Sequence, residues 1–448
     1  MQVDNYVITE RTAKQPPASF FRRLQFLGPG FILSASIVGS GELIATTTLG
    51  ARAGFVAFWI IIASCLIKVA VQLEFGKQAI LTGQTAMKSF GQLPGTRIGK
   101  SNWAVWVVFI LTSFKSIQIG GILGGAAIVL HMLYGGFSIT IWIVIVAFIA
   151  AVLIFKGYYS IVEKTSLLMI VGFTALTITA VFVLRYTEYN FTWADVAEGL
   201  KFKFPPGIVA VAFGAFGITG VASDEIIAYN YWCIEKGYAA FTGPRTGTPE
   251  WKQRAQGWIR VMYLDAGFAM IIYTSVTAAF YLLGAAVLHN RTAIPEGNEV
   301  IETLALIYTQ SIGPDAKNVY LVGAFFVLFS SVFASLAAWT RLYSDIFGEM
   351  GWISFSNISQ RKKVISILAW VLPFLWAAVF LFIKLPVIMI LSGGLVGSVL
   401  LFLVVYAALQ FRKKRIQFLP SGVFYNTIFW LSVVSIIGVG VYGIVQLF

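Results

Sequence analysis

Long apolar stretches, separated by short polar segments, dominate the pattern of the chain. A helix that crosses the hydrocarbon core of a bilayer needs about 20 mostly apolar residues, and many stretches approach that length. They lie at residues 28–52, 55–76, 104–133, 138–155, 165–184, 206–233, 259–288, 317–345, 364–383, 385–410 and 425–447. The pattern therefore predicts an all-α, polytopic membrane protein with about eleven transmembrane helices.

Lysine and arginine are distributed unevenly between the segments that connect these spans. If the N-terminal tail is inside, 23 of the 32 Lys and Arg residues fall in the tail and the inner loops. Seven fall in outer segments, and Lys68 and Lys115 lie within spans. Cytoplasmic loops of membrane proteins carry such an excess. We therefore expect a cytoplasmic N-terminus and an outside C-terminus.

The composition agrees with this interpretation. Hydrophobic residues make up 58% of the chain and charged residues only 11%, whereas a soluble domain carries about 25% charged residues. The net charge of +13 is explained by the inner loops, so it indicates no nucleic-acid partner. Cys65 and Cys233 fit neither a disulfide framework nor a zinc site, and we expect no cofactor. Enzymatic activity has no support, because we find no nucleophile–base pair and no phosphate loop.

Two spans that are five positions apart carry glycines in the middle of an apolar stretch. In the first span, Gly39-Ser40-Gly41 is followed at once by Glu42. In the sixth, Gly214, Gly217 and Gly220 precede Ser223-Asp224-Glu225. Transporters often bind substrate where two corresponding helices are interrupted near the midplane of the membrane. The pattern thus predicts broken helices 1 and 6.

A break of this kind frees backbone carbonyls, which is tolerated in a membrane only beside a cavity or a ligand. Freed carbonyls around Gly39 and Gly220, with Ser40, Ser223 and nearby carboxylates, would make an oxygen-rich cation site. Buried charges are costly, so Glu42, Asp224 and Glu225 need partners. The structural alternative is that these acids pair with Lys68 or Lys115 and merely hold helices together.

The remaining intramembrane charges have simpler explanations, except for Lys115. That lysine could replace a coupling cation, neutralise a carboxylate of the site, or bind an anionic substrate group. We expect Lys68 and Glu74 to form a local pair or to extend toward the membrane surface. For Asp265 we expect an ion pair with an inner arginine, and for His131 a position near the outer surface.

The position of the two breaks implies two related halves. We expect residues 1–25 to form a cytosolic tail, residues 26–184 a first five-helix repeat and residues 206–410 a second. Residues 425–447 would form an additional C-terminal helix. Because the residue strings at the two breaks differ, this division rests on hydropathy and on the position of the breaks.

The motifs resemble those of the Nramp metal transporters. Gly28-Pro29-Gly30, followed by Gly39-Ser40-Gly41-Glu42, is similar to the family pattern of Gly-Pro-Gly, eight residues, then Asp-Pro-Gly-Asn. Similar segments follow at 155–164, at 260–265 and at the serine pair Ser330-Ser331. The resemblance covers roughly residues 20–447. It implies a LeuT-type fold with a 5+5 inverted repeat, in an integral protein of a bacterial inner membrane.

The ligand positions of the family differ here. The family's metal-binding Asp falls on Gly39, its Pro on Ser40 and its Asn on Glu42. Its Met-Pro-His falls within 221–224, so that Val221 or Ala222 stands where the methionine would be. The acidic pair of its proton route falls near Ile119 and Ile122. Loss of a thioether and gain of acids favour hard cations such as Mg²⁺ or Mn²⁺.

The resemblance therefore implies a secondary transporter that moves a divalent cation by alternating access. The expected site residues are Gly39, Ser40, Glu42, Gly220, Ala222, Ser223, Asp224 and Glu225, with Lys115 and Lys68 as coupling or charge-balancing residues. Spans 1 and 6 would move against spans 3, 4, 8 and 9. The loss of Asp at position 39 and the presence of Lys115 leave two alternatives open. One is the transport of an amine or an amino acid, and the other is a sensor that does not transport.

Overall fold

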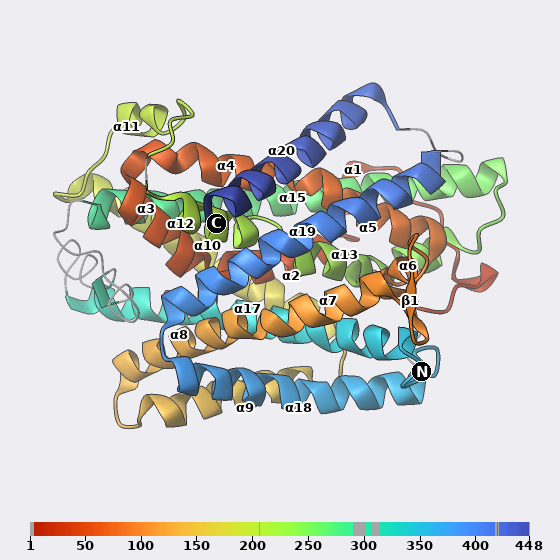
Figure 1. The fold of residues 1–448 in the computed structure, drawn as a ribbon, viewed down its shortest axis with the longest axis horizontal. Coiled ribbons are helices and arrows are strands. Elements are labelled where there is room, and N and C mark those ends of the chain that lie inside the picture. The colour runs from red at the N-terminus through yellow and green to blue at the C-terminus, as the bar shows by residue number, and fades with distance from the viewer. Residues whose placement is uncertain are drawn as a thin grey trace.

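The structure, a computed structural model, describes residues 4–205, 207–289, 302, 303, 305, 314–416, 419 and 421–447. Most of these residues lie in helices that run roughly along the long axis of the molecule (Figure 1). A small antiparallel hairpin joins β1 (Arg97–Ile98) to β2 (Ser101–Asn102). Four further helical segments are the 3₁₀ turns η1 (Glu10–Thr12), η3 (Gly54–Ala57) and η4 (Leu184–Tyr186), and the π-helical segment η2 (Val38–Thr46).

The α-helices are described by their bounds. They are α1 (Phe20–Leu24), α2 (Pro29–Ile37), α3 (Thr47–Ala53), α4 (Phe58–Ile67), α5 (Val69–Thr82), α6 (Ala86–Phe90), α7 (Trp103–Phe114), α8 (Ser116–Tyr134), α9 (Ile139–Ile154), α10 (Tyr159–Val183), α11 (Trp193–Glu198), α12 (Val209–Ile218), α13 (Ser223–Lys236), α14 (Tyr238–Thr242), α15 (Pro249–Leu288), α17 (Pro314–Glu349), α18 (Ile358–Ile383), α19 (Pro386–Ile416) and α20 (Val423–Leu447).

Each predicted span corresponds to one or two of these helices, so the predicted fold class is confirmed. Within the described residues, nine helical segments are long and apolar enough to cross a membrane, and Ile139–Ile154 is a shorter apolar helix. One of the nine, Glu42–Thr82, contains parts of the first two predicted spans. They are separated at Gly54, where the backbone has a φ of +59° and a 3₁₀ turn begins.

Glycines allow the central helices to approach closely. A Cβ atom at Gly124 of α8 would lie 2.1 Å from the Phe380 ring of α18, and one at Gly121 would lie 2.9 Å from Cβ of Met389 in α19. Small residues at such contacts are typical of helix packing in membranes. α8 is therefore held firmly between α18 and α19, in the middle of the expected scaffold.

The N-terminal tail lies at one end of the molecule, with other segments that the charge distribution places inside. The backbone N–H of Lys14 donates to the carbonyl of Phe241 at 2.8 Å, and the indole of Trp258 donates to the carbonyl of Lys14 at 3.0 Å. α11, from a predicted outer segment, lies at the opposite end (Figure 1). The predicted alternation of sides along the chain agrees with this arrangement.

Candidate functional site

The sixth span is broken, as the glycine pattern predicts. α12 ends at Ile218, and Thr219 has extended backbone angles (φ −67°, ψ 134°). Gly220 follows with a φ of +65°, a conformation that glycine adopts without steric cost. Ala222 is extended again, and α13 begins at Ser223. We refer to residues 219–222 as the break.

The first span is interrupted in a different way from the one predicted. Instead of an unwound segment, the π-helical stretch Val38–Thr46 connects α2 to α3. Such stretches occur often at functional sites. Gly39 is needed here because a Cβ at this position would lie 1.9 Å from the carbonyl oxygen of Val327 in α17. The backbone of span 1 therefore lies directly against α17.

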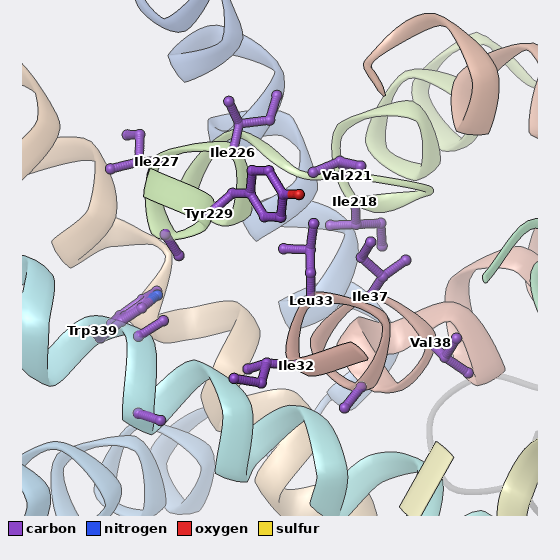
Figure 2. Close-up of a cluster of buried hydrophobic side chains, with 14 of the residues drawn as sticks. Ile32, Leu33, Ile37, Val38, Ile218, Val221, Ile226, Ile227, Tyr229 and Trp339 are labelled. Atoms are coloured by element: carbon purple, nitrogen blue, oxygen red, sulfur yellow. The ribbon is translucent and has the colours of Figure 1, made fainter. Parts of the chain in front are cut away.

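The serine pair of α17 binds the backbone just before the π-helical stretch. The hydroxyl of Ser330 donates to the carbonyl of Ala35 at 3.0 Å, and the hydroxyl of Ser331 donates to the carbonyl of Ser36. These side chains satisfy carbonyls at the point where the helical hydrogen-bond pattern changes. Figure 2 shows the apolar side chains that surround this region, with Leu33 and Ile37 of span 1 beside Ile218 and Val221 at the break.

Glu42 connects span 1 to the break. Its carboxylate accepts a hydrogen bond from the Thr46 hydroxyl at 2.5 Å and one from the backbone N–H of Gly220 at 3.1 Å. The side chain is fully buried. The structure thus places Glu42 and Gly220 together, as the sequence predicts for two parts of one site.

Glu225 also joins span 1 to the break. Its carboxylate accepts from the Ser36 hydroxyl at 2.7 Å and from the backbone N–H of Ala222 at 2.8 Å. The second bond caps the first turn of α13, where acidic side chains are favourable. Ala222 is buried and contributes its backbone N–H to the site.

Asp224 points in a different direction from its neighbour. Its carboxylate is paired with the ammonium of Lys115, and it accepts a second bond, at 3.1 Å, from the indole N–H of Trp339 in α17. Both charged side chains are nearly inaccessible to solvent. Lys115 lies at the junction of α7 and α8. The ion pair joins the start of α13 to the expected scaffold, which is the structural alternative considered above.

Lys68 occupies the carbonyls that the break exposes. It lies at the junction of α4 and α5, and its ammonium donates to the carbonyls of Phe216 (2.5 Å) and Thr219 (2.6 Å). The Ser64 hydroxyl also donates to the carbonyl of Thr219, at 2.9 Å. The last carbonyls of a helix have no partner within it, and a lysine supplies one here. Lys68 thus neither pairs with Glu74 nor extends toward the membrane surface, so both expectations for it are wrong, whereas Glu74 forms its local pair with Lys77 at 2.9 Å.

Two hydroxyls at the break are buried without a hydrogen-bond partner in the described structure. They belong to Thr219 and Ser223. Buried hydroxyls usually find a partner, so these two are free to meet a ligand. The backbone of Ser40 lies in the π-helical stretch, but its side chain is outside the described residues.

The carboxylates do not form a preformed metal cluster. Among the described residues, no group of three or more His, Cys, Asp or Glu side chains is placed to hold a metal ion. Glu42 and Glu225 contact the break directly, whereas Asp224 faces Lys115 and Trp339. In this arrangement the predicted ligands lie around the break but do not converge on one point.

Asp265 has a different role from the ion pair that the sequence suggested. Its carboxylate accepts from the backbone N–H groups of Gly28 (2.8 Å) and Gly30 (2.6 Å), and from the Tyr229 hydroxyl at 3.1 Å. The first N–H groups of a helix lack partners within it, so Asp265 caps α2. This contact explains the Gly-Pro-Gly motif in part, because a Cβ at Gly30 would lie 2.7 Å from the carbonyl of Asp265.

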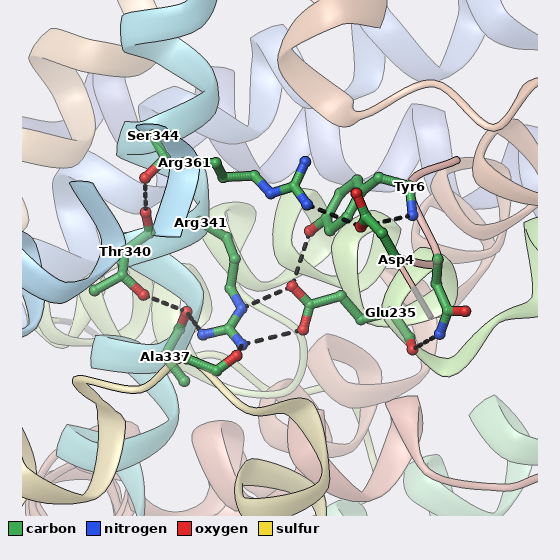
Figure 3. Close-up of polar contacts among 10 residues, drawn as sticks. Asp4, Tyr6, Glu235, Ala337, Thr340, Arg341, Ser344 and Arg361 are labelled. Atoms are coloured by element: carbon green, nitrogen blue, oxygen red, sulfur yellow. Dashed lines mark hydrogen bonds and ion pairs between the residues drawn. The ribbon is translucent and has the colours of Figure 1, made fainter. Parts of the chain in front are cut away.

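A polar network closes the end of the molecule at which the N-terminal tail lies (Figure 3). The guanidinium of Arg341 in α17 donates to both carboxylate oxygens of Glu235 in α13, at 3.0 and 3.1 Å. The Tyr6 hydroxyl donates to the same carboxylate at 2.9 Å, and Arg361 of α18 is paired with Asp4 at 2.8 Å. The tail therefore connects α13 to α17 and α18.

Several of these residues were missed by sequence reasoning. Thr46 lies four positions after Glu42, a spacing that places both on one face of an α-helix and was available as a signal. Trp339 and Ser36 gave no signal, because an aromatic or a hydroxyl residue in an apolar helix is ordinary. Tyr6 lies in a tail that the sequence treats as a separate segment.

Comparison with known proteins identifies the family. A family model described as natural resistance-associated macrophage protein-like (Nramp) matches residues 30–446. A relative from Mycobacterium tuberculosis, named divalent metal cation transporter MntH, is 26% identical over 280 residues, which are 60% of this chain and 60% of the relative. The chain thus spans about three fifths of that relative's length.

Two solved structures share the fold. A mutant of the manganese transporter of Eremococcus coleocola has a TM-score of 0.70 at 14% identity, covering 98% of this chain and 91% of that chain. Mhp1, a nucleobase-cation-symport-1 family transporter, has a TM-score of 0.54 at 12% identity, covering 97% of this chain and 95% of that chain. At these identities the likeness concerns the fold alone. The chain is thus an integral, multi-pass membrane protein with a LeuT-type fold, and it belongs to the Nramp family.

Proposed function

We propose that this protein is a secondary transporter that moves a divalent metal cation across the membrane. Membership of the Nramp family supports the proposal, as do the names of its relatives, a divalent metal cation transporter and a manganese transporter. Hard ions such as Mg²⁺ or Mn²⁺ suit the candidate ligands, which are carboxylates, hydroxyls and carbonyls.

One observation carries this proposal. Glu42 and Glu225 are buried and accept hydrogen bonds from the N–H groups of Gly220 and Ala222 in the break, while the hydroxyls of Thr219 and Ser223 are buried without a partner in the described structure. Two carboxylates next to two free hydroxyls form an anionic, oxygen-rich environment inside the membrane. Such groups are costly unless they serve a ligand or a pathway.

The two lysines set a condition for cation binding. If all five groups are ionised, Glu42, Asp224 and Glu225 carry three negative charges against two positive ones on Lys68 and Lys115. A divalent cation that uses Asp224 must displace Lys115 from it. We therefore propose that cargo and Lys115 alternate at Asp224, and that this exchange accompanies the movement of span 1 and α12–α13 against a scaffold of α8, α9, α17 and α18.

A second candidate cargo is a small organic solute, an amine or an amino acid. Two features of the site favour it. Lys68 already occupies the freed carbonyls of Phe216 and Thr219, and Asp224 is already neutralised by Lys115. Mhp1, whose fold is similar, is described with bromovinylhydantoin bound, so this architecture does not restrict the cargo to ions.

Uptake into proteoliposomes tests the cation proposal. Wild-type protein would be compared with Glu42→Gln and Asp224→Asn, and with Glu188→Gln as a matched control on an exposed turn. Saturable uptake of Mg²⁺ or Mn²⁺ that falls below about a tenth in both site variants, but not in the control, supports the proposal. Folded wild-type protein that moves neither ion, and that binds an amino acid or amine instead, supports the second candidate.

The side of the membrane that each end faces is also a proposal. We infer an inner-membrane protein with a cytoplasmic N-terminus and an outside C-terminus, because Lys and Arg are concentrated in the predicted inner segments. Cys65 and Cys233 are buried, so they should give little background with a membrane-impermeant maleimide. Lys164→Cys should be labelled only from the cytoplasmic side and Glu188→Cys only from outside.

A further inference from the structure

An apolar cavity of about 650 Å³ lies between α4, α12 and α20. Its volume is within the range of sites that hold small ligands, about 300–1,000 Å³. Ser64 contributes a hydroxyl, but this already donates to the carbonyl of Thr219. Most of the lining is apolar or aromatic, and it includes Trp59, Phe213, Phe216, Gly438 and Tyr442. The cavity therefore suits an occupant without strongly polar groups in its buried part.

The cavity reaches the membrane-facing surface of α20. Tyr442 and Val439, which line it, are 50% and 36% exposed. A Cβ at Gly438 would have no atom within 4 Å, so α20 leaves open space at this position. In a protein surrounded by lipid, an apolar opening of this kind is accessible to the hydrocarbon chains of the bilayer.

One rim of the cavity has the composition of a membrane–water interface. Phe202 and Phe204 line it, and the lysine between them, Lys203, accepts a hydrogen bond from the Trp59 indole at its backbone carbonyl, at 2.8 Å. Tryptophan and lysine are typical of this region of a membrane. The Lys201 and Lys203 side chains are about 60% exposed and share the Glu198 carboxylate. These three side chains leave one net positive charge at the rim.

The backbone at this rim is unusual. Phe202 has a φ of +56°, a left-handed conformation that is unfavourable for a bulky side chain. Its ring lies against Trp59 with a centroid distance of 5.2 Å, and the side chain is still 74% exposed. Unfavourable conformations of this kind tend to occur at ligand clamps.

We propose that this cavity binds one acyl chain of an anionic phospholipid, whose phosphate lies near Lys201 and Lys203. The apolar lining and the opening toward lipid specify the chain, and the charge of the rim specifies the headgroup. The second chain of the lipid would lie along the exposed surface of α20. This site is separate from the cargo site of the proposed function and does not depend on the identity of the cargo.

The cavity shares a wall with the break. Phe216 lines the cavity, and its carbonyl accepts the hydrogen bond from Lys68. The ring centroid is 4.6 Å from the Lys68 ammonium. An acyl chain in the cavity would pack against Phe216, whose ring and carbonyl both contact the ammonium. The bound lipid would thus help to hold Lys68 at the end of α12.

Native mass spectrometry of the purified full-length protein tests the proposal. The probes are phosphatidylglycerol with long chains (palmitoyl-oleoyl) and with short chains (dihexanoyl). We expect the long-chain lipid to be retained at least about tenfold better, because a short chain buries little apolar area. Equal binding of the two lipids to wild-type protein would overturn the acyl-chain site without any variant.

A matched pair of glycine substitutions locates the site. Gly438→Leu fills the cavity, whereas Gly172→Leu adds the same side chain to α10, where a Cβ also meets no atom within 4 Å. Binding should fall about tenfold in the first variant and stay unchanged in the second. If Gly438→Leu is folded and binds the lipid as wild type does, the cavity is not the site.

The headgroup is tested separately. Phosphatidylglycerol should bind better than phosphatidylcholine, and the double variant Lys201→Gln/Lys203→Gln should remove this preference while it leaves chain binding intact. If wild-type protein binds both headgroups equally, the lysines do not select an anionic headgroup, and only the acyl-chain site stands.

Discussion

Lys115, at the junction of α7 and α8, forms a buried ion pair with Asp224, which lies 109 positions away at the start of α13. The pair joins the expected scaffold to the half-helix that follows the break. Removal of one member of a buried pair is strongly destabilising, because it leaves an uncompensated charge. A variant that lacks Lys115 can therefore distinguish a divalent cation from an organic solute as the cargo.

Lys115→Met should make the protein less stable and more responsive to divalent cations. Without its partner, Asp224 needs another positive charge, and the cost of leaving it unpaired is about 3–5 kcal/mol. Under the cation proposal, Mn²⁺ or Mg²⁺ should raise the melting temperature of this variant more than that of wild type. Lys164→Met, at an exposed position, is the control. If neither ion changes the melting temperature of the Lys115→Met variant, the result would favour an organic cargo.

Gly220→Ala should destabilise the break. The left-handed conformation of Gly220, with a φ of +65°, costs an alanine about 1–2 kcal/mol. The new Cβ would also lie 2.7 Å from Cα of Cys65, so α4 would have to move. Thermal unfolding of the purified variant should occur at a lower temperature than that of wild type, and transport should be lost. Gly172→Ala, in open space on α10, should be neutral or slightly stabilising. An unchanged melting temperature in Gly220→Ala would refute this account of the break.

Tyr6→Phe should loosen the contact between the N-terminal tail and α13. The variant loses the bond to Glu235, which is worth about 1 kcal/mol, while Arg341 still holds that carboxylate. Hydrogen exchange of residues 4–14 should become about fivefold faster, and Tyr186→Phe, whose ring is exposed, should have no effect. Unchanged exchange would mean that the tail is held by its other contacts alone.

The tail contact should also be insensitive to pH in the physiological range. Burial and the neighbouring Glu235 carboxylate raise the pKa of Tyr6 well above its ordinary value. A raised pKa means that the protonated hydroxyl persists below that pKa, so the bond is lost only in strongly alkaline solution. Exchange of residues 4–14, corrected for its intrinsic pH dependence, should be the same between about pH 6 and pH 9.

Lipid binding at the rim should likewise be constant at mildly acidic pH. Hydrogen bonds from Lys201 and Lys203 lower the pKa of Glu198 to about 2. The carboxylate is therefore ionised down to that value, and the contribution of this pairing is lost only as the pH falls through it. Retention of phosphatidylglycerol should not change between about pH 5 and pH 8, whereas Glu198→Gln should increase it at every pH. A pronounced change in wild type over this range would point to another titrating group.

The sequence predicted the location of the break in span 6 better than the contacts around it. Glycines within apolar spans predict a break at Gly220, and the structure has one, because no other residue adopts that conformation easily in a membrane helix. The same glycine pattern could not distinguish unwinding from π-helix in span 1, since that choice depends on the carbonyl of Val327 and the serines of α17. Most partners of Lys68 and Asp265 are backbone atoms far along the chain, and backbone atoms leave no signature in residue type.

The π-helical stretch in span 1 gives the two interrupted helices different mechanical properties. Span 6 is no longer helical at the break, and Lys68 donates to two of the freed carbonyls, those of Phe216 and Thr219. Span 1 stays helical through Val38–Thr46, in the π-helical form, whose hydrogen bonds characteristically span five residues instead of four. If one π-helical turn became α-helical, the turn would contain about one residue fewer. The residues that follow it would then rotate by about 100° about the helix axis. Such a rotation about the helix axis would move Glu42 away from Gly220 while the backbone of span 1 stays hydrogen-bonded within the helix.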